Sequence, residues 1–353
     1  MLFLAEQERQ QWNNLGSEIL QSRISPRDWQ GDIRSNLRPF FNYYAGTLLA
    51  AQGQEHLGKQ WFIAGAQVEE DGLFSNAFAA AFLERQNNRF VMPEPAFADP
   101  RPFVHFAGVP VVKKSREHFI KQCGHSLPRF GHPVKIMDIG CGNGALVVSL
   151  LHHLQDEEKI RDVAEVLLID QSPAMIELAK QTVADELPGT TVLTSNNRIE
   201  NISGDINGTY DIGLSSLAYH HMPFEQKQVH LGKLKHLIDH FIIFELDANN
   251  DLPELYSPEL AMSVYQSYGR IIDFVFAHDA PVEVAQACVD CFLMTEAVSI
   301  LTRPRGQRTD YHMLRTQWRH LFDTELGPEF VCLCDAACYA DEYLELFTMH
   351  YGR

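Results

Sequence analysis

Residues 134–144 read Val-Lys-Ile-Met-Asp-Ile-Gly-Cys-Gly-Asn-Gly, and this stretch decides the fold. Its first five residues form a short apolar run that is typical of a buried β-strand. The glycines at 140, 142 and 144 then allow a sharp turn in which the backbone comes close to a ligand. From Asn143 onward, leucines and valines recur at helical spacing. A strand, a glycine-rich turn and a helix in this order predict a binding loop at a helix N-terminus.

The pattern continues along the chain as short apolar runs that alternate with amphipathic helices. We expect further strands at 166–169, 191–193, 210–215 and 240–244. A helix opens at Ser172-Pro173, where serine is a good N-cap and proline suits the first helical position. Residues 330–333 and 345–350 are expected to form an antiparallel pair at the edge of the sheet. This alternation predicts an α/β fold of the doubly wound, Rossmann-like kind, with a mostly parallel sheet.

Two helical regions flank this core. Residues 2–22, 38–52, 55–69 and 73–85 are expected to be helical, as is most of 253–301. Five prolines within residues 91–112 predict an extended connector, because proline disrupts a helix interior, and a further helix is expected at 114–124. We therefore divide the chain into a helical N-terminal region with its connector, residues 1–112, and an α/β domain, residues 113–353. The second unit contains a helical lid inserted after the fifth strand, at about 250–320.

Composition and net charge indicate which kinds of binding partner and which cellular location to expect for this protein. A net charge of −17 argues against a large phosphate-binding face, so we expect no nucleic-acid partner. The first ten residues do not resemble a signal peptide, and the sequence suggests no membrane span. The seven cysteines are expected to be reduced thiols, which favours a cytoplasmic location. The N-terminal helices are expected to cover the active site, bind a partner or pair two subunits in a homodimer.

The glycine loop discriminates between two ligands. A dinucleotide-binding loop has the form G-x-G-x-x-G and places a pyrophosphate on the helix N-terminus. This chain has G-x-G-x-G, with Asp138 two residues before the first glycine. A carboxylate there would repel a pyrophosphate and attract the ammonium group of an amino-acid moiety. Asp170, at the end of the second strand, is placed to accept hydrogen bonds from ribose hydroxyls. The loop therefore favours S-adenosylmethionine over a nicotinamide dinucleotide.

Three segments together carry a family resemblance: Met137–Gly144, Leu168–Ala179 and Tyr210–Met222. They resemble the core of class I S-adenosylmethionine-dependent methyltransferases, close to the type found in ubiquinone and menaquinone biosynthesis. The resemblance implies a seven-stranded sheet with a reversed last strand. It also implies that the cofactor, and its product S-adenosylhomocysteine, bind across the carboxyl ends of strands one, two and four.

The cofactor residues expected from the loop and from this resemblance are Asp138, Gly140, Cys141, Gly142, Asn143, Asp170, Gln171, Asn197, Ile199 and Ser216. One position departs from the family pattern. Methyltransferases of this kind often have an aspartate after strand three that binds the adenine amino group, whereas this chain has Asn196 and Asn197 in that loop. An asparagine carbonyl can accept the same hydrogen bond.

Two clusters are candidates for the chemistry. His220 and His221 lie just past the fourth strand, and a histidine there can act as a general base. In the lid, Arg303, Arg305 and Arg308 suit a carboxylate or another anionic substrate, with Asp310, Tyr311 and His312 beside them. The alternative is that this segment is a solvated turn around Pro304 and Gly306. We assign His220, His221, Arg308, Tyr311 and His312 as catalytic candidates. A metal at His220, His221 and His312 stays open but is not favoured.

The sequence therefore predicts an enzyme that methylates a small molecule, with a carboxylate-bearing acceptor as one option. A protein methyltransferase and a non-catalytic partner subunit that keeps the fold remain as alternatives. The intact glycine loop and Asp170 argue against the second of these.

Overall fold

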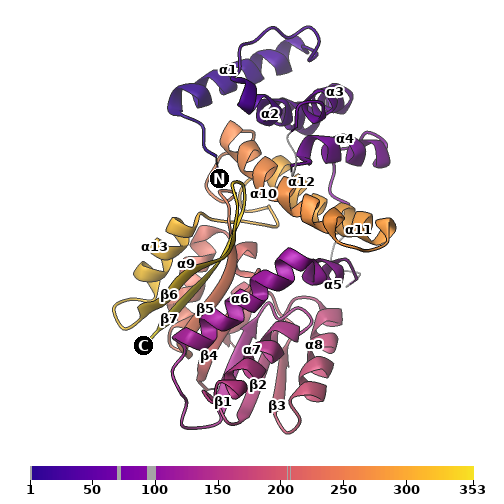
Figure 1. Ribbon diagram of the computed structural model, residues 1–353. Helices are drawn as coiled ribbons and strands as arrows, with labels where there is room; N and C mark the ends of the chain where they lie inside the picture. Colours follow the sequence, from indigo (N-terminus) through magenta and orange to yellow (C-terminus); the bar gives the residue numbers. More distant parts are fainter. Residues whose placement is uncertain (1, 70–72, 94–100, 205, 207) are drawn as a thin grey trace.

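The computed structural model describes residues 2–69, 73–93, 101–204, 206 and 208–353, and its centre is one twisted sheet (Figure 1). Seven strands run in the order β3-β2-β1-β4-β5-β7-β6. The first five pair in parallel, whereas β7 runs antiparallel to both β5 and β6. This confirms the predicted mostly parallel Rossmann-like sheet and its reversed last strand. The bounds are β1 Val134–Ile139, β2 Val163–Ile169, β3 Thr191–Ser195, β4 Tyr210–Ser216, β5 Ile238–Asp247, β6 Val331–Ala340 and β7 Glu345–Gly352.

The alternation of side chains along each strand builds a core on both faces of the sheet. In β1, Ile136 joins the core that includes Leu150 of α7, while its neighbour Met137 joins the opposite core with Trp318 of α13. At the start of α8, the Ser172 side chain caps the helix by accepting a hydrogen bond from the backbone N–H of Met175. The helices that cover the sheet are α6 Pro110–Ser126, α7 Ala145–Asp156, α8 Pro173–Glu186, α9 Phe224–Leu234 and α13 Arg315–Glu325.

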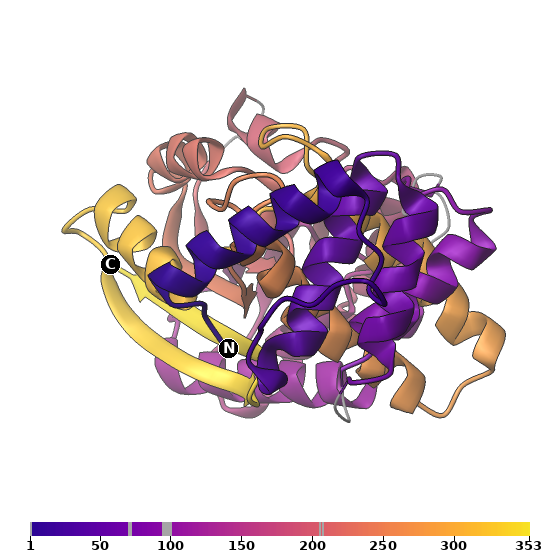
Figure 2. The ribbon, with the colours of Figure 1, turned by 90° about the horizontal axis from the view of Figure 1, so that it is seen from above.

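A helical layer lies over the carboxyl ends of the strands (Figures 1 and 2). Its members come from two distant parts of the chain: α1 Glu6–Ser22, α2 Arg38–Ala51, α3 Glu55–Ala66 and α4 Ser75–Arg85 from the N-terminus, and α10 Pro258–Ala277, α11 Val282–Cys288 and α12 Met294–Thr302 from the insertion after β5. The Ser75 hydroxyl donates to the Tyr265 carbonyl at 2.6 Å, and the Phe40 and Tyr265 rings lie 4.4 Å apart. Arg85 forms an ion pair of 2.6 Å with Asp290. The N-terminal helices therefore pack directly on the inserted helices.

The predicted extended connector at 91–112 is wrong over its described second half. Residues Arg101–Gly108 form α5, and α6 starts at Pro110. Pro102 and Pro110 sit in the first turns of these helices, where the missing N–H would have had no intrahelical partner. Residues 94–100 lie outside the described residues. Short helical turns complete the structure: η1 Ser35–Leu37, η2 Ile199–Gly204, η3 Tyr219–His221 and a π-helical turn, η4 Val289–Leu293.

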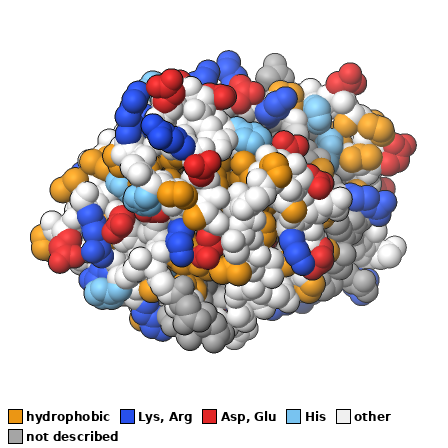
Figure 3. All heavy atoms as spheres, turned by 90° about the horizontal axis from the view of Figure 1, so that it is seen from below, with side chains coloured by type: hydrophobic (Ala, Val, Ile, Leu, Met, Phe, Trp, Pro, Cys, Tyr) orange, Lys and Arg blue, Asp and Glu red, His pale blue; other side chains and the backbone are white. Residues whose placement is uncertain are grey.

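The segment Val282–Thr302 is, by length and composition, apolar enough to cross a membrane, which the sequence analysis did not anticipate. Within the protein, 72% of its apolar window is buried, as in the core helix of a globular protein. Opposite the helical layer, acidic and basic side chains are interspersed on the face seen from below (Figure 3).

Candidate active site

A cavity of about 510 Å³ lies between the carboxyl ends of the central strands and the helical layer. One part is formed by the glycine loop and the ends of β2 and β4, with Gly140, Gly142, Asp170, Gln171, Met175, Ile199 and Ser216. Another part of the lining is apolar and comes from α5, α10, η4 and β7, with Phe106, Ile271, Phe274, Phe292 and Leu346, while Phe103 of α5 lies next to Gly142 of the glycine loop. Between them lie the polar side chains of Tyr268, Glu296, His220, His221, Asp310 and His312. The cavity is therefore a single space with two chemically different ends.

The glycine loop has the shape that the sequence predicts. Gly140, Gly142 and Gly144 all have φ between 51° and 75°, the left-handed region that favours glycine. A Cβ on Gly140 would lie 2.2 Å from the Cβ of Ala218, so the loop passes directly under the segment that follows β4. That segment begins at Leu217, a non-glycine residue with a φ of 49°. This unusual conformation directs the chain across the glycine loop and carries the two histidines into the cavity.

Asp170 holds the loop and also faces the cavity. Its two carboxylate oxygens accept hydrogen bonds from the backbone N–H groups of Gly142, at 3.1 Å, and Ser172, at 2.8 Å. Each oxygen retains a lone pair for a further donor, as ribose hydroxyls would require. Nearby, the Ser216 hydroxyl is buried and has no hydrogen-bond partner among the described residues. The lining thus offers polar groups at the positions where the sequence predicts the cofactor.

Asp138 is buried behind the loop. Burial, together with the nearby charge of Asp170, raises the pKa of its carboxyl to about 7, although Arg116 acts in the opposite direction. Four residues expected to bind the cofactor are not among the described lining residues: Asp138, Cys141, Asn143 and Asn197. Their direct contact with the cofactor stays a prediction. By contrast, Arg198 and Glu200 line the cavity beside Ile199, and the sequence analysis did not single them out.

Glu245 fixes the orientation of His220. This glutamate is fully buried in β5, and its Oε1 accepts the backbone N–H groups of Ala218, at 3.2 Å, and Tyr219, at 2.9 Å. Its Oε2 lies 2.8 Å from Nδ1 of His220. The His220 contact lowers the pKa of the Glu245 carboxyl, although burial alone would raise it. A carboxylate cannot donate, so Nδ1 of His220 carries the proton.

His221 and Asp310 form the second pair of the cluster. Nδ1 of His221 lies 3.0 Å from Oδ1 of Asp310 and 3.2 Å from the Thr309 carbonyl oxygen. Burial lowers the pKa of His221, but the Asp310 carboxylate outweighs this and raises it to about 9. At neutral pH the imidazole is therefore protonated unless another cation replaces the proton. The bare ring does not have the lowered or near-neutral pKa that the predicted general base requires.

His312 lies against His220, with ring centroids 4.0 Å apart. Burial above all, and then the neighbouring His221 and Lys227, lower the pKa of His312 well below its usual value, so this imidazole is neutral. Its Nδ1 is buried and has no hydrogen-bond partner among the described residues. The structure thus brings His220, His221 and His312 together, as the sequence analysis considered.

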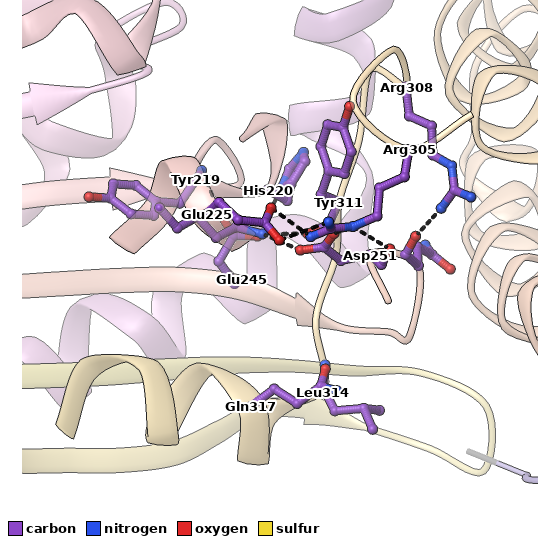
Figure 4. A network of polar contacts seen from close by, with 12 residues as sticks. Tyr219, His220, Glu225, Glu245, Asp251, Arg305, Arg308, Tyr311, Leu314 and Gln317 are labelled. Atoms are coloured by element: carbon purple, nitrogen blue, oxygen red, sulfur yellow. Dashed lines mark hydrogen bonds and ion pairs between the residues drawn. The ribbon is translucent and has the colours of Figure 1, made fainter. Parts of the chain in front are cut away.

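The loop that carries Asp310 and His312, residues 303–314, is anchored by charged side chains (Figure 4). Arg305 pairs with Asp251 at 2.7 Å and with Glu225 at 2.9 Å. Lys227 is fully buried, donates to the Tyr311 carbonyl at 2.6 Å and lies 4.6 Å from the centre of the Trp318 ring. Burial lowers the pKa of Lys227 to about 8. These contacts hold the loop against α9.

The structure contradicts the expectation that Arg305 and Arg308 bind a substrate carboxylate. The guanidinium of Arg308 donates to the carbonyls of Arg303 at 3.1 Å and Asn250 at 2.9 Å, so it is committed to the loop itself. Arg305 is committed to Asp251 and Glu225. Tyr311, another catalytic candidate, donates its backbone N–H to the His220 carbonyl at 2.6 Å, and neither it nor Arg308 is among the described lining residues. These three residues support the site from outside.

Sequence reasoning missed Glu245 and Glu296. A signal for Glu245 was present, because it is the one charged residue that follows the apolar run 241–244 of an otherwise buried strand. Glu296 lies in an apolar helical stretch, and its Oε2 accepts a hydrogen bond of 3.0 Å from the Tyr268 hydroxyl. Burial raises the pKa of Glu296 well above its usual value. A buried acid within an apolar run is rarely retained without a partner.

The sheet order and the glycine loop below the cavity define a protein of the class I, Rossmann-like methyltransferase architecture. Residues 136–239 match a protein family described as a methyltransferase domain. This match and the sheet order support the class I S-adenosylmethionine-dependent methyltransferase fold for this part of the chain. The closer resemblance to the ubiquinone and menaquinone type is not confirmed. A comparison with curated protein sequences finds no significant match.

Solved structures share the fold at low sequence identity. SCL7 from Oryza sativa is 12% identical, with a TM-score of 0.60 over 86% of this chain and 99% of that one. This likeness extends well beyond residues 136–239, so it includes much of the helical layer. A S-adenosylmethionine-dependent methyltransferase from Clostridium acetobutylicum is 12% identical, with a TM-score of 0.42 over 71% of this chain and 97% of that one. The magnesium protoporphyrin IX methyltransferase of Synechocystis, solved with bound SAH, is 14% identical, with a TM-score of 0.40 over 69% and 84%.

Proposed function

We propose that this protein transfers a methyl group from S-adenosylmethionine to a small, largely apolar acceptor. The observation that carries the proposal is the single cavity that joins the glycine loop and Asp170 to an apolar chamber, with His220, His221 and Asp310 between them. The cavity must hold both molecules, so the acceptor is small. Its walls include residues of α5 and of the inserted α10 and η4 as well as the strand ends, which favours an enclosed metabolite over a polymer.

The residues present fit the cofactor. The glycine loop offers backbone N–H groups without side chains in the way, because Gly140 and Gly142 leave no room for a Cβ. Asp170 can accept from ribose hydroxyls, and the buried Ser216 hydroxyl still lacks a partner among the described residues. S-adenosylmethionine supplies an electrophilic methyl carbon on a positively charged sulfonium. Acidic groups near the cavity, Asp170 and Asp310 among them, favour a bound cation.

The chain's own task is to align the acceptor and to manage its proton. A lone pair on the acceptor forms the bond to the methyl carbon, and the electrons of the broken carbon–sulfur bond go to sulfur. The acceptor's proton must leave before or during this step. His220, His221 and Asp310 lie where the acceptor's reacting atom meets the cofactor end of the cavity. The aromatic side chains of Phe274 and Phe292 would hold the rest of the acceptor.

A neutral acceptor fits this cavity better than a carboxylate. Arg305 and Arg308 are committed to protein groups. Arg303 lines the cavity but is exposed, so it offers a cation only at the edge.

The test is a screen for transfer of isotope-labelled methyl from S-adenosylmethionine. We expect label in an apolar small molecule that bears a hydroxyl or amino group, such as a phenol or an aromatic amine. The Asp170→Asn variant should fail in the same assay, whereas Asp185→Asn, an exposed carboxylate on α8, should behave like the wild type. Label that appears only in protein or nucleic acid would contradict the proposed acceptor class.

A further inference from the structure

Three ligating atoms converge where the histidine pair meets the lid loop. Nε2 of His220 lies 3.5 Å from Oδ1 of Asp310, and Nδ1 of His221 lies 3.0 Å from the same oxygen. The ligand atoms of these three residues all lie within 4.8 Å of one another. Two ligands of one ion, each about 2.1 Å from it, are about 3.0 Å apart at a right angle and about 3.4 Å apart at a tetrahedral angle. The observed spacings match those values.

The orientation of His220 decides which of its ring nitrogens can bind a metal ion. Because Nδ1 of His220 faces Glu245, Nε2 is the ring nitrogen that is directed toward Oδ1 of Asp310 and can serve as a metal ligand. A metal ion between Nε2 and Oδ1 would be bound by both of these buried atoms. A carboxylate that orients a histidine in this way is also the usual partner of a metal-bound imidazole.

Asp310 provides a second, independent observation. Its side chain is fully buried, and Oδ1 has no hydrogen-bond partner among the described residues, although two imidazole nitrogens lie near it. Its other oxygen accepts a hydrogen bond from the Thr309 hydroxyl, so Oδ1 is the atom available for a ligand. A buried carboxylate oxygen in this state carries a large desolvation cost. The oxygen faces the cavity that the proposed substrate enters.

We propose that His220, His221 and Asp310 bind one divalent transition-metal ion, such as Fe²⁺ or Zn²⁺, at the junction of the two ends of the cavity. Two imidazoles and one carboxylate suit these ions, whereas Ca²⁺ and Mg²⁺ prefer oxygen ligands throughout. Glu245 is a positioning residue that acts through His220. His312, stacked on His220, closes one side of the site and lies close enough to Glu245 to join a second arrangement of ligands.

The role of the ion rests on the proposed function, whereas the site itself stands on the geometry of the cluster. Three protein ligands leave positions of the ion open toward the cavity. A divalent cation there lowers the pKa of an acceptor hydroxyl, whose proton passes to solvent, and so supplies what a protonated His221 cannot. Nδ1 of His221 must lose its proton to bind the ion, so ion binding releases a proton.

The experiment uses the full chain after removal of metals with a chelator. Co²⁺ serves as the probe, because its visible absorption reports the ligands and their geometry, and Zn²⁺ and Fe²⁺ compete with it in separate arms. We expect one Co²⁺ per chain, with competition by both ions. The variants His221→Ala and Asp310→Asn should weaken Co²⁺ binding at least 100-fold. The variants His132→Ala and Asp211→Asn remove a matched histidine–carboxylate pair outside the cavity and should bind Co²⁺ like the wild type.

Binding of S-adenosylmethionine, measured by calorimetry on the same samples, separates this inference from the proposed function. Wild-type protein that binds Co²⁺ but no S-adenosylmethionine would keep the metal site and contradict the proposed function. Variants that retain S-adenosylmethionine binding are folded, so their loss of Co²⁺ reports the site. The metal proposal is overturned if the wild-type chain binds no stoichiometric Co²⁺, or if Asp310→Asn binds it as tightly as the wild type.

Discussion

The substitution Glu245→Gln tests how the sheet positions the histidine cluster. In the wild type, Oε1 accepts two backbone N–H groups and Oε2 holds Nδ1 of His220 at 2.8 Å. Glutamine retains the first two contacts through its carbonyl oxygen and turns its amide N–H₂ toward His220. The ring proton must then move to Nε2, which removes the lone pair from the proposed metal site. A hydrogen bond to a charged group contributes about 1.5–3 kcal/mol, so we expect a 10- to 100-fold effect.

The assay compares Co²⁺ affinity with S-adenosylmethionine affinity in one protein preparation. We predict that Glu245→Gln weakens Co²⁺ binding 10- to 100-fold and changes cofactor binding less than twofold. Glu165→Gln, a matched change at the amino end of β2 and distant from the cavity, should leave both affinities unchanged. If the Glu245→Gln chain binds Co²⁺ as tightly as the wild type, or loses both ligands equally, the positioning role assigned to Glu245 is refuted.

Three further predictions concern the loop and the lid. Gly140→Ala should weaken S-adenosylmethionine binding more than tenfold, because the added Cβ would collide with Ala218. The control Gly189→Ala also places alanine at a positive φ, 91°, but in open space, so its affinity measured by calorimetry should equal that of the wild type. Equal affinities of the two variants would contradict the role assigned to the glycine loop. Asp138 has a pKa of about 7 in the folded protein and about 4 in the unfolded chain, so only the folded state holds its proton at pH 5. The free energy of unfolding of the wild type, measured with urea, should therefore fall by on the order of 2 kcal/mol relative to Asp138→Asn between pH 5 and 8. A difference between the two proteins that does not change with pH would contradict this prediction. Arg305→Ala should speed tryptic cleavage after Arg308, the site that remains in the loop because Arg303 precedes a proline. Arg129→Ala, which removes an exposed ion pair, should not speed it, and equal cleavage rates would show that the Arg305 ion pairs are dispensable.

The strands were predictable because their signal is local. Each of the first five strands is a short apolar run followed by a helical pattern, and the structure places all five where those runs lie. Helices α5 and α6 were not anticipated between 101 and 113, because the prolines that normally end a helix instead begin these two. Helix α13 carries a strongly polar sequence, and only the buried face with Trp318 fixes it against the sheet.

The site was predictable only where sequence spacing dictates contact. The glycine loop and Asp170 follow two adjacent strands, so the parallel sheet brings them together without further information. The loop 303–314 meets β4 only through long-range packing, so the sequence could not show that Asp310 would reach His221. Nor could it show which arginines are already paired. The prediction that Arg305 binds a substrate carboxylate was wrong for this reason, since its partners Asp251 and Glu225 lie 54 and 80 residues away along the chain.

The central claim is that the cavity binds S-adenosylmethionine between the glycine loop and Asp170. Calorimetric titration of the full chain with S-adenosylmethionine, and separately with a nicotinamide dinucleotide, tests it most directly. We predict one S-adenosylmethionine per chain, at least tenfold weaker binding by Asp170→Asn, which loses a charged acceptor, and no heat from the dinucleotide. Binding of the dinucleotide without S-adenosylmethionine, or an Asp170→Asn affinity equal to that of the wild type, would contradict the account.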